Sequence, residues 1–229
     1  TMAFGQEGRR AVVYQVSNSG NKYALKIYKA KYRSQDIFKQ STILKQYASL
    51  PGLAACDQKV ILRETDSDLV QEYPEFEYAI LMPWINGETW FDVFVRNTRL
   101  SLSDSRAIAK NLAQVLCNLE QRGLAHCDLS GANTIVDFSN RQVSLIDFDE
   151  MFGSTLPKPS YSPRGSDGYS HKVQREQGSW EFTTDRFSGA ILMLEMLICH
   201  DDRIRFSADT ESYFSYKDMQ DPKANRFSL

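Results

Sequence analysis

The sequence lacks the residue patterns that several common functions require. It has only three histidines and four cysteines in 229 residues, and no two cysteines form a Cys-x-x-Cys pair. These spacings exclude the usual zinc fingers, whose ligands come in closely spaced pairs. Positive and negative charges nearly cancel, since 27 Lys and Arg residues stand against 29 Asp and Glu residues. This balance argues against nucleic-acid binding through general neutralisation of phosphates, although a local basic patch stays open, and we expect no nucleic-acid partner.

The sequence also lacks an apolar run that could cross a membrane. The longest run, at 187–198, is interrupted by Glu195 and is shorter than the roughly 20 residues of a spanning helix. The N-terminal residues have no apolar stretch of the kind found in signal peptides. We therefore expect a cytoplasmic protein with reduced cysteines and no membrane segment.

The first third of the chain has the patterns of a small β-sheet with one helix. The β-branched and aromatic runs 11–16 and 23–28 flank a Ser/Asn/Gly cluster and predict a hairpin. Apolar residues at helical spacing predict a helix over 34–50, which a Pro-Gly pair ends. Residues 59–63 and 77–82 predict two further strands, separated by a polar segment.

The rest of the chain has mainly helical patterns. An amphipathic helix is predicted over 103–122 and a buried one over 185–198. Two short strands are predicted at 134–138 and 143–147, on either side of a turn. The stretch 153–168 is rich in Pro, Ser and Gly and predicts a surface loop.

The pattern changes at residues 83–87, Pro-Trp-Ile-Asn-Gly. We therefore expect one α+β domain of two lobes, with a small β-rich lobe at 1–82, a hinge at 83–87 and a helical lobe at 88–229. Few residues follow the last predicted helix, and a threonine precedes the first methionine. From this we expect a helical lobe with a shortened C-terminal part, in a chain excised from a longer protein with further domains.

Four polar residues occur in an order that suits phosphoryl transfer. Lys26 lies in an otherwise apolar strand, Asp128 and Asn133 lie five residues apart, and Asp147 ends a strand. Because the transferred group is strongly anionic, its transfer depends on positioning and on electrostatic stabilisation. Lysine supplies a positive charge, Asn and Asp supply oxygen ligands for magnesium, and Asp can accept a hydroxyl proton. Each residue alone also fits an ordinary interpretation: an edge-strand lysine, a polar turn or a solvated strand end.

This order resembles the protein kinase motifs V-A-I-K, H-R-D-L-x-x-x-N and D-F-G, here A-L-K, H-C-D-L-S-G-A-N and I-D-F-D. With Met-Pro-Trp-Ile at the hinge, these segments are similar to those of a divergent bacterial serine/threonine protein kinase-like group. The resemblance spans nearly the whole chain. It implies a bilobal protein kinase-like fold that uses ATP and Mg²⁺.

The resemblance also assigns roles to individual residues. It implies that Asp128 accepts the proton of the attacking hydroxyl and that Lys26 holds the α- and β-phosphates. It implies that Asn133, counted among the catalytic residues, and Asp147 bind the magnesium ion. The further nucleotide-binding residues that it implies are Gly8, Val13, Ala24, Met82, Trp84, Glu88 and Ile135.

Two further segments extend the resemblance. Asp185-Arg186-Phe187 resembles the start of the helix beneath the kinase catalytic loop, which implies that Asp185 accepts hydrogen bonds from the main chain around His126 and Cys127. Residues 165–169, Gly-Ser-Asp-Gly-Tyr, resemble the end of a kinase activation segment.

The sequence departs from the kinase pattern at positions that bear on activity. Of the three glycines in the Gly-rich loop only Gly8 remains, and Gln40 replaces the glutamate that pairs with the strand lysine. Either Gln40 only orients Lys26, or an acid such as Asp36 replaces the missing glutamate. Asp149 stands where the D-F-G motif has its glycine.

We therefore expect an ATP- and magnesium-dependent phosphotransferase, most similar to a divergent bacterial serine/threonine protein kinase. Its substrate is expected to be a protein that the sequence does not identify. A pseudokinase, which binds nucleotide or acts as a scaffold, stays open because of the departures. A small-molecule kinase also stays open, because the H-x-D-L-S and I-D-F-D segments are similar to those of such enzymes.

Overall fold

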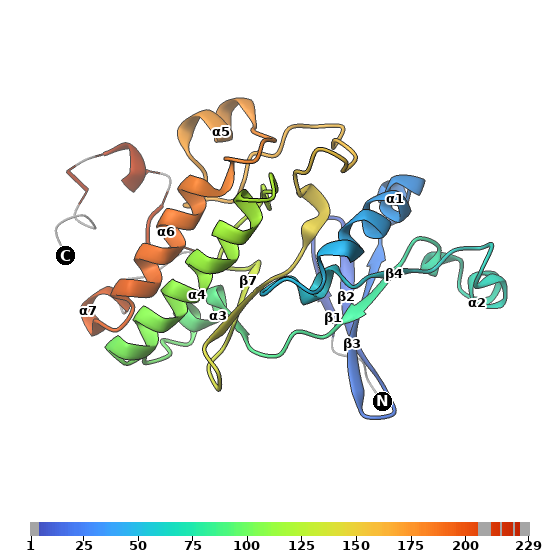
Figure 1. Ribbon diagram of the computed structural model, residues 1–229, viewed down its shortest axis with the longest axis horizontal. Coiled ribbons are helices and arrows are strands. Elements are labelled where there is room, and N and C mark those ends of the chain that lie inside the picture. Colours follow the sequence, from blue (N-terminus) through green and yellow to red (C-terminus); the bar gives the residue numbers. More distant parts are fainter. Residues whose placement is uncertain (1–4, 206–211, 216, 222, 225–229) are drawn as a thin grey trace. The chain divides into compact units, whose positions relative to one another are not determined.

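The computed structural model describes residues 5–205, 212–215, 217–221, 223 and 224 of the chain (Figure 1). It consists of two compact units: the first is Thr1–Ile85 with Thr155–Pro157, and the second is Asn86–Ser154 with Lys158–Leu229. The boundary at Ile85 falls in the segment 83–87. The predicted shortening of the C-terminal part concerns the residues after 198, and some of these lie outside the described ranges. Within those ranges no helix has the length and apolar character needed to cross a membrane.

The first unit is built on an antiparallel sheet in the order β1-β2-β3-β5-β4. Its strands are β1 (Gly5–Glu7), β2 (Ala11–Asn18), β3 (Asn21–Tyr28), β4 (Lys59–Val60) and β5 (Ile80–Pro83). The predicted hairpin is confirmed, since β2 and β3 pair from Ala11 opposite Tyr28 to Asn18 opposite Asn21. Ser19 and Gly20 both have positive φ, which closes the two-residue turn.

Helix α1 (Gln35–Leu44) is shorter than the helix predicted over 34–50. After Leu44 the chain continues in tighter turns, in which the N–H of Ala48 donates to the carbonyl of Lys45 at 3.2 Å. These bonds span three residues instead of four, so the α-helix ends although the apolar spacing continues.

The strands predicted at 59–63 and 77–82 are present as β4 and β5. Strand β4 is shorter than predicted, and β5 begins later in the chain than predicted. The polar segment between them contains helix α2 (Ser67–Glu72), which the sequence analysis missed. A six-residue helix is too short for a clear apolar period.

Both faces of the sheet are covered by apolar side chains. On one face the buried residues are Ala11, Tyr28, Val60 and Ile80, with Ile37 of α1 packed against them. On the other face Leu25 and Ile27 of β3 pack with Ile61, Ala79 and Val70 of α2. The central strand β3 therefore has its side chains in apolar surroundings on both sides.

The second unit combines helices with a three-stranded sheet in the order β6-β7-β8. Its elements are β6 (Glu88–Thr89), α3 (Trp90–Val95), α4 (Leu102–Glu120), β7 (Thr134–Asp137), β8 (Gln142–Leu145), α5 (Lys172–Gln177), α6 (Asp185–Ile198) and α7 (Asp202–Arg205). The predicted helices at 103–122 and 185–198 are confirmed as α4 and α6. With the β-sheet of the first unit, these elements give the α+β, kinase-like fold that was predicted.

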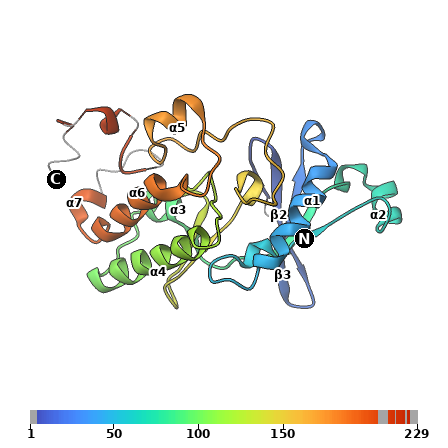
Figure 2. The same cartoon turned by 45° about the horizontal axis from the view of Figure 1, so that its top comes forward.

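Helices α4 and α6 lie side by side, as both views show (Figures 1 and 2). Their close approach depends on Gly189 of α6. A Cβ atom at this position would lie only 2.5 Å from Cδ1 of Leu116 in α4. The buried face of α4, with Ile108, Leu112 and Leu119 along it, explains the period of the sequence.

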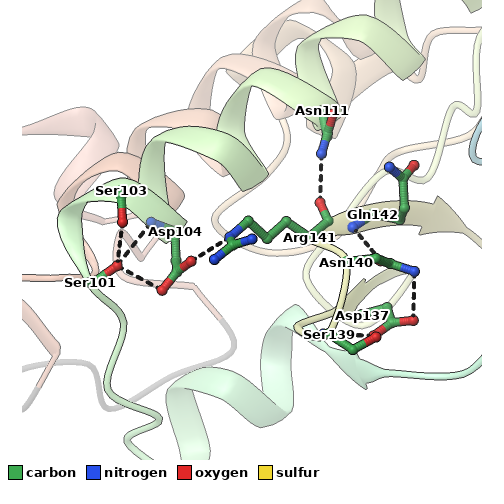
Figure 3. A network of polar contacts seen from close by, with 9 residues as sticks. All are labelled: Ser101, Ser103, Asp104, Asn111, Asp137, Ser139, Asn140, Arg141 and Gln142. Carbon is green, nitrogen blue, oxygen red and sulfur yellow. Dashed lines mark hydrogen bonds and ion pairs between the residues drawn. The ribbon is translucent and has the colours of Figure 1, made fainter.

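A polar network fastens the β7–β8 hairpin to α4 (Figure 3). Arg141, at the tip of the hairpin, donates from Nε to Asp104 in the first turn of α4. The carbonyl oxygen of Arg141 accepts a 2.6 Å hydrogen bond from Nδ2 of Asn111, which lies about two turns further along α4 than Asp104. Ser101 caps α4 by accepting the N–H of Asp104 at 3.1 Å. The helix therefore holds both the side chain and the main chain of the hairpin tip.

The hairpin turn is also fixed from within. Asp137 accepts hydrogen bonds from the N–H of Ser139 at 2.9 Å and from Nδ2 of Asn140 at 3.0 Å. Oδ1 of Asn140 in turn accepts the N–H of Gln142 at 2.8 Å (Figure 3). Such Asx contacts stabilise a turn without help from the rest of the fold. The two ends of this braced hairpin carry Asn133 and Asp147.

The side chain of Glu195 in α6 is fully buried and accepts four hydrogen bonds. The donors are Trp90 Nε1 at 3.1 Å, Tyr169 Oη at 2.9 Å, Ser212 Oγ at 2.6 Å and the N–H of Tyr213 at 2.7 Å. Burial raises the pKa of Glu195 to about 7, although these donors favour the ionised form. The residue that interrupts the apolar run is thus a polar centre of the core.

The raised pKa of Glu195 predicts a pH-dependent stability. Because the pKa is about 7 in the folded chain and 4.5 in the reference state, the folded state holds a proton that the unfolded state releases. The stabilisation is complete below the unfolded pKa and is lost as the pH rises through 7. Between pH 5 and pH 8 the unfolding free energy of the wild type should therefore fall by about 2 kcal/mol more than that of Glu195→Gln, which has no carboxyl group at this position.

Urea unfolding at a series of pH values measures this difference. Glu176→Gln, at an exposed position of α5, is the matched control and should follow the wild type at every pH. Parallel pH profiles for wild type and Glu195→Gln would show that the buried carboxyl does not titrate in this range.

Candidate functional site

The loop from His126 to Asn133 brings Asp128 and Asn133 together. Nδ2 of Asn133 donates to the carbonyl oxygen of Asp128 at 2.9 Å and lies 3.5 Å from its Oδ2. Because the amide nitrogen makes both contacts, the amide oxygen of Asn133 is directed away from them. A turn closes the loop, since the N–H of Asn133 donates to the carbonyl of Ser130 at 3.2 Å.

Asp147 is placed beside this loop through its neighbour Ile146. The N–H of Ile146 donates to the carbonyl of Asn133 at 3.0 Å, and its carbonyl oxygen lies 2.8 Å from Nε2 of His126. A carbonyl oxygen only accepts, so Nε2 of His126 carries the proton. His126 is fully buried, and its ring holds the main chain of Ile146.

The prediction that a strand runs to Asp147 is wrong. Strand β8 ends at Leu145, and Asp147 has left-handed backbone angles, φ 63° and ψ 66°. Cys127, next to Asp128, also has a positive φ of 65°. Such conformations are uncommon for residues other than glycine, and they tend to occur at functional sites. Here they adjoin or include both candidate aspartates.

Asp185, at the start of α6, anchors the main chain of the loop from His126 to Asn133. One carboxylate oxygen accepts the N–H of His126 and the other accepts the N–H of Cys127, the latter at 2.9 Å. This is the contact that the resemblance implied. Burial raises the pKa of Asp185, against the opposing effect of the His126 ring and the two N–H donors.

Cys127 is buried, and burial raises the pKa of its thiol. It is therefore a protonated, inert side chain at physiological pH.

One contact of Asp128 was not predicted. Oγ of Ser166 donates to Oδ1 of Asp128 at 3.0 Å, from a position 38 residues further along the chain. The sequence did contain a signal, because Ser166 belongs to the Gly-Ser-Asp-Gly-Tyr segment that resembles an activation segment. The two oxygens of Asp128 thus have different neighbours, Ser166 on one side and Asn133 on the other.

In the first unit, the strand register places four candidate residues on one face of the sheet. Val13 lies opposite Lys26, and Ala24 lies opposite Met82. Ala24 and Lys26 are two residues apart on β3, so all four point to the same side. Lys26 is buried and lies on the central strand, so the interpretation as an edge-strand lysine is wrong.

Gly8 and Trp84 lie at the ends of this sheet. The N–H of Gly8 donates to the carbonyl of Ala11 at 2.8 Å, which closes the turn between β1 and β2. The N–H of Trp84 donates to the carbonyl of Lys22 at 3.2 Å, so the pairing of β5 with β3 continues past Pro83.

Asp36, the alternative acid for Lys26, is engaged within its own helix. Its carboxylate lies 3.1 Å from Nζ of Lys39, and both side chains are exposed. On α1 the buried positions are instead Ser41 and Leu44. Asp36 is thus exposed and paired with Lys39, whereas Gln40 is half-buried on the same helix.

Glu88 and Ile135 lie on the adjoining strands β6 and β7. Glu88 pairs with Val136, and Ile135 pairs with Thr89. Oε2 of Glu88 is buried, lies 3.4 Å from Arg96 and makes no hydrogen bond within the described part of the chain. Gly87 makes the pairing possible, because a Cβ there would lie 2.4 Å from the carbonyl oxygen of Val136.

The candidate residues thus form two groups, one in each unit. Asp128, Asn133 and Asp147, with Glu88 and Ile135 on the neighbouring strands, belong to the second unit. The others belong to the sheet of the first unit, and they are Gly8, Val13, Ala24, Lys26, Met82 and Trp84.

The oxygen atoms of Asn133 and Asp147 suit magnesium. Mg²⁺ prefers hard oxygen ligands, and it is commonly held by one or two carboxylates while phosphates and water complete its shell. Within the described ranges no three His, Cys, Asp or Glu side chains form a cluster that could hold a metal ion. The donor set therefore fits an ion that arrives with a phosphate ligand better than it fits a metal held by protein alone.

Comparison with known proteins gives two findings. Residues 4–222 match the family of the protein kinase domain. The serine/threonine-protein kinase cds1 of Schizosaccharomyces pombe is 23% identical to the chain over 127 residues, which are 52% of this chain and 25% of that protein. The chain thus matches about a quarter of the length of this relative.

The anchoring role of Asp185 predicts a large effect of a small change. In Asp185→Asn one acceptor oxygen is replaced by an NH₂ group that faces a buried N–H. The unfolding free energy, measured by urea denaturation, should fall by about 2–4 kcal/mol. Asp68→Asn, at an exposed position of α2, is the matched control and should change it by less than about 0.5 kcal/mol. Equal stability of the two variants would contradict the anchoring role.

Proposed function

The chain belongs to the protein kinase domain family, and on this premise we propose that it is an ATP- and magnesium-dependent phosphotransferase. The observation that supports the proposal most is the arrangement of Asp128, Asn133 and Asp147. Main-chain hydrogen bonds through Ile146 and through the turn at Ser130 hold these three residues in one small region of the second unit. A set of two carboxylates and one amide is what phosphoryl transfer to a hydroxyl requires.

In the proposed reaction, Asp128 orients the hydroxyl of the substrate and accepts its proton. Its Oδ1 is held by Ser166, and the contact of Asn133 with its main chain fixes the loop, so the carboxylate has a defined direction. General base catalysis requires such a group within hydrogen-bond reach of the proton.

Asn133 and Asp147 are proposed as the magnesium ligands, through the amide oxygen and the carboxylate. Magnesium neutralises phosphate charge when it is bound. The left-handed backbone of Asp147 and the anchored peptide of Ile146 would fix the direction of the ligand before the nucleotide binds. Such preorganisation lowers the cost of forming the reactive arrangement.

Lys26 is proposed to hold the α- and β-phosphates of ATP. Water screens a buried charge less than an exposed one, so the ammonium group of the buried Lys26 would act strongly on a bound anion. The remaining proposed nucleotide contacts are those of Gly8, Val13, Ala24, Met82, Trp84, Glu88 and Ile135.

We propose a protein with serine or threonine hydroxyls as the substrate, and a divergent, bacterial-type enzyme. The family match and the similarity to the fission yeast protein, a serine/threonine-protein kinase, support the substrate class. The resemblance of the H-C-D-L-S-G-A-N segment to a bacterial kinase-like group supports the proposal of a divergent, bacterial-type enzyme. A small-molecule hydroxyl is the alternative that a substrate screen would reveal.

A pseudokinase is the second candidate, and one observation favours it. Asp36, an acid that could replace the missing helix glutamate, is paired with Lys39 on an exposed face. Gln40 carries no charge, so it cannot balance the charge of Lys26. If phosphoryl transfer requires an acid that balances the charge of Lys26, the chain would bind nucleotide without transferring its phosphate.

The role of Asp128 predicts the result of a phosphotransfer assay. With γ-labelled ATP, magnesium and a mixture of protein substrates, wild type should transfer label to serine or threonine. Asp128→Ala should reduce the rate at least about 100-fold, because it removes the general base. Asp68→Ala, at an exposed position of α2, is the matched control and should keep the rate. Equal transfer by wild type and Asp128→Ala would contradict the assignment.

The role of Asp147 predicts how magnesium affects nucleotide binding. ATP should raise the melting temperature of wild type more with magnesium than without it, because a ligand of the folded state stabilises that state. Asp147→Asn should abolish the additional shift from magnesium while it leaves the melting temperature without ligand nearly unchanged. If the shift stays the same in Asp147→Asn, the ion is bound elsewhere. A nucleotide shift without any transfer would instead favour the pseudokinase.

A further inference from the structure

The buried carboxylate of Glu195 connects two segments that lie far apart in the sequence. One is the 165–170 loop, through Tyr169, and the other is residues 212–214, here called the latch segment. Ser212, Tyr213 and Phe214 of the latch segment are all buried, with at most 3% of their surface exposed. Glu195 is thus the common partner of a loop and of a segment that follows α6 and α7.

The latch segment also touches the 165–170 loop directly. Gly168 has a φ of 75°, and a Cβ on it would lie 2.3 Å from the carbonyl oxygen of Phe214 and 2.5 Å from Cβ of Ser212. No residue with a side chain fits there without displacing the latch segment. The contact is therefore tight enough for a change in one segment to affect the other.

The same loop contacts the candidate catalytic aspartate. Oγ of Ser166 donates to Asp128 at 3.0 Å. The carbonyl oxygen of Ser166 accepts a 3.0 Å hydrogen bond from Oγ of Ser170. Tyr169, between these two serines in sequence, is the residue bonded to Glu195. A continuous series of contacts therefore runs from the latch segment through Glu195 and the loop to the carboxylate of Asp128.

The chemistry at Glu195 makes each donor important. Trp90 Nε1 and the N–H of Tyr213 can only donate, and they occupy different oxygens of the carboxylate. The hydroxyl of Ser212 donates a second hydrogen bond to Oε1, and the hydroxyl of Tyr169 donates a second one to Oε2. All four donors are uncharged, so each of these hydrogen bonds contributes to holding the buried carboxyl group of Glu195 in place. Removing one of them weakens the connection between the segments.

We propose that Glu195 and the latch segment position the 165–170 loop, and that through Ser166 they fix the carboxylate of Asp128. Glu195 is then a positioning residue, because it acts on the reaction through Tyr169 and Ser166. The inference rests on the proposed function insofar as Asp128 is taken as the catalytic base. The mechanical connection itself does not depend on activity.

Hydrogen exchange of the main-chain amides tests the connection without any assay of activity. Tyr169→Phe and Ser212→Ala each remove one hydroxyl donor of Glu195 and leave the two N–H donors in place. Both should raise exchange in the 165–170 loop roughly tenfold, as expected for the loss of a hydrogen bond to a charged group. Ser215→Ala is the matched control, because Ser215 bonds Asp218 instead of Glu195 and should leave the loop unchanged.

A kinetic measurement separates positioning from a merely structural effect. Tyr169→Phe should lower kcat severalfold with little change in the KM for ATP, because only the orientation of Asp128 is altered. Unchanged exchange in the 165–170 loop in both Tyr169→Phe and Ser212→Ala would overturn the proposal, and so would an unchanged kcat in an active enzyme. If wild type transfers no phosphate, the proposed function fails, while the exchange result still decides whether the latch exists.

Discussion

The candidate site depends above all on the buried carboxylate of Asp185. Its two oxygens accept the N–H groups of His126 and Cys127, and they thereby tie the loop that carries Asp128 to the first turn of α6. Cys127 has a positive φ, which costs about 1–2 kcal/mol for a residue other than glycine. The anchored N–H groups offset this cost. Because α6 packs closely on α4 at Gly189, the loop is tied through Asp185 to a closely packed pair of helices.

From this anchor the rest of the site follows step by step. The His126 ring, held by the anchored main chain, donates to the carbonyl of Ile146, whose N–H reaches Asn133. Asp147 follows Ile146 directly, and the hairpin that ends there is braced on α4 through Arg141. In protein kinases the phosphoryl group is transferred largely by positioning and electrostatics, so a rigid arrangement of few side chains is sufficient. Gln40, one of the departures from the family pattern, lies outside this anchored group.

Much of the fold could be predicted from the sequence, because α4, α6 and the β2–β3 hairpin have strong local periods. The contact of Asp185 could be predicted as well, since a motif carried it. The left-handed conformation of Asp147 could not, because nothing in a strand-like run shows where pairing stops. The Gly-Ser-Asp-Gly-Tyr segment was the one signal for the contact of Ser166 with Asp128 across 38 residues. Glu195 accepts hydrogen bonds from distant segments, and no local pattern encodes those contacts. In the sequence Glu195 was only an interruption of an apolar run.

The central claim is that the anchored loop and the end of β8 present Asn133 and Asp147 to a magnesium ion that accompanies ATP. A crystal structure of the chain with magnesium and a non-hydrolysable ATP analogue tests it most directly. The account predicts an ion about 2.1 Å from the amide oxygen of Asn133 and from a carboxylate oxygen of Asp147, bridged to the phosphates. An ion or nucleotide bound with neither residue as a ligand would contradict it.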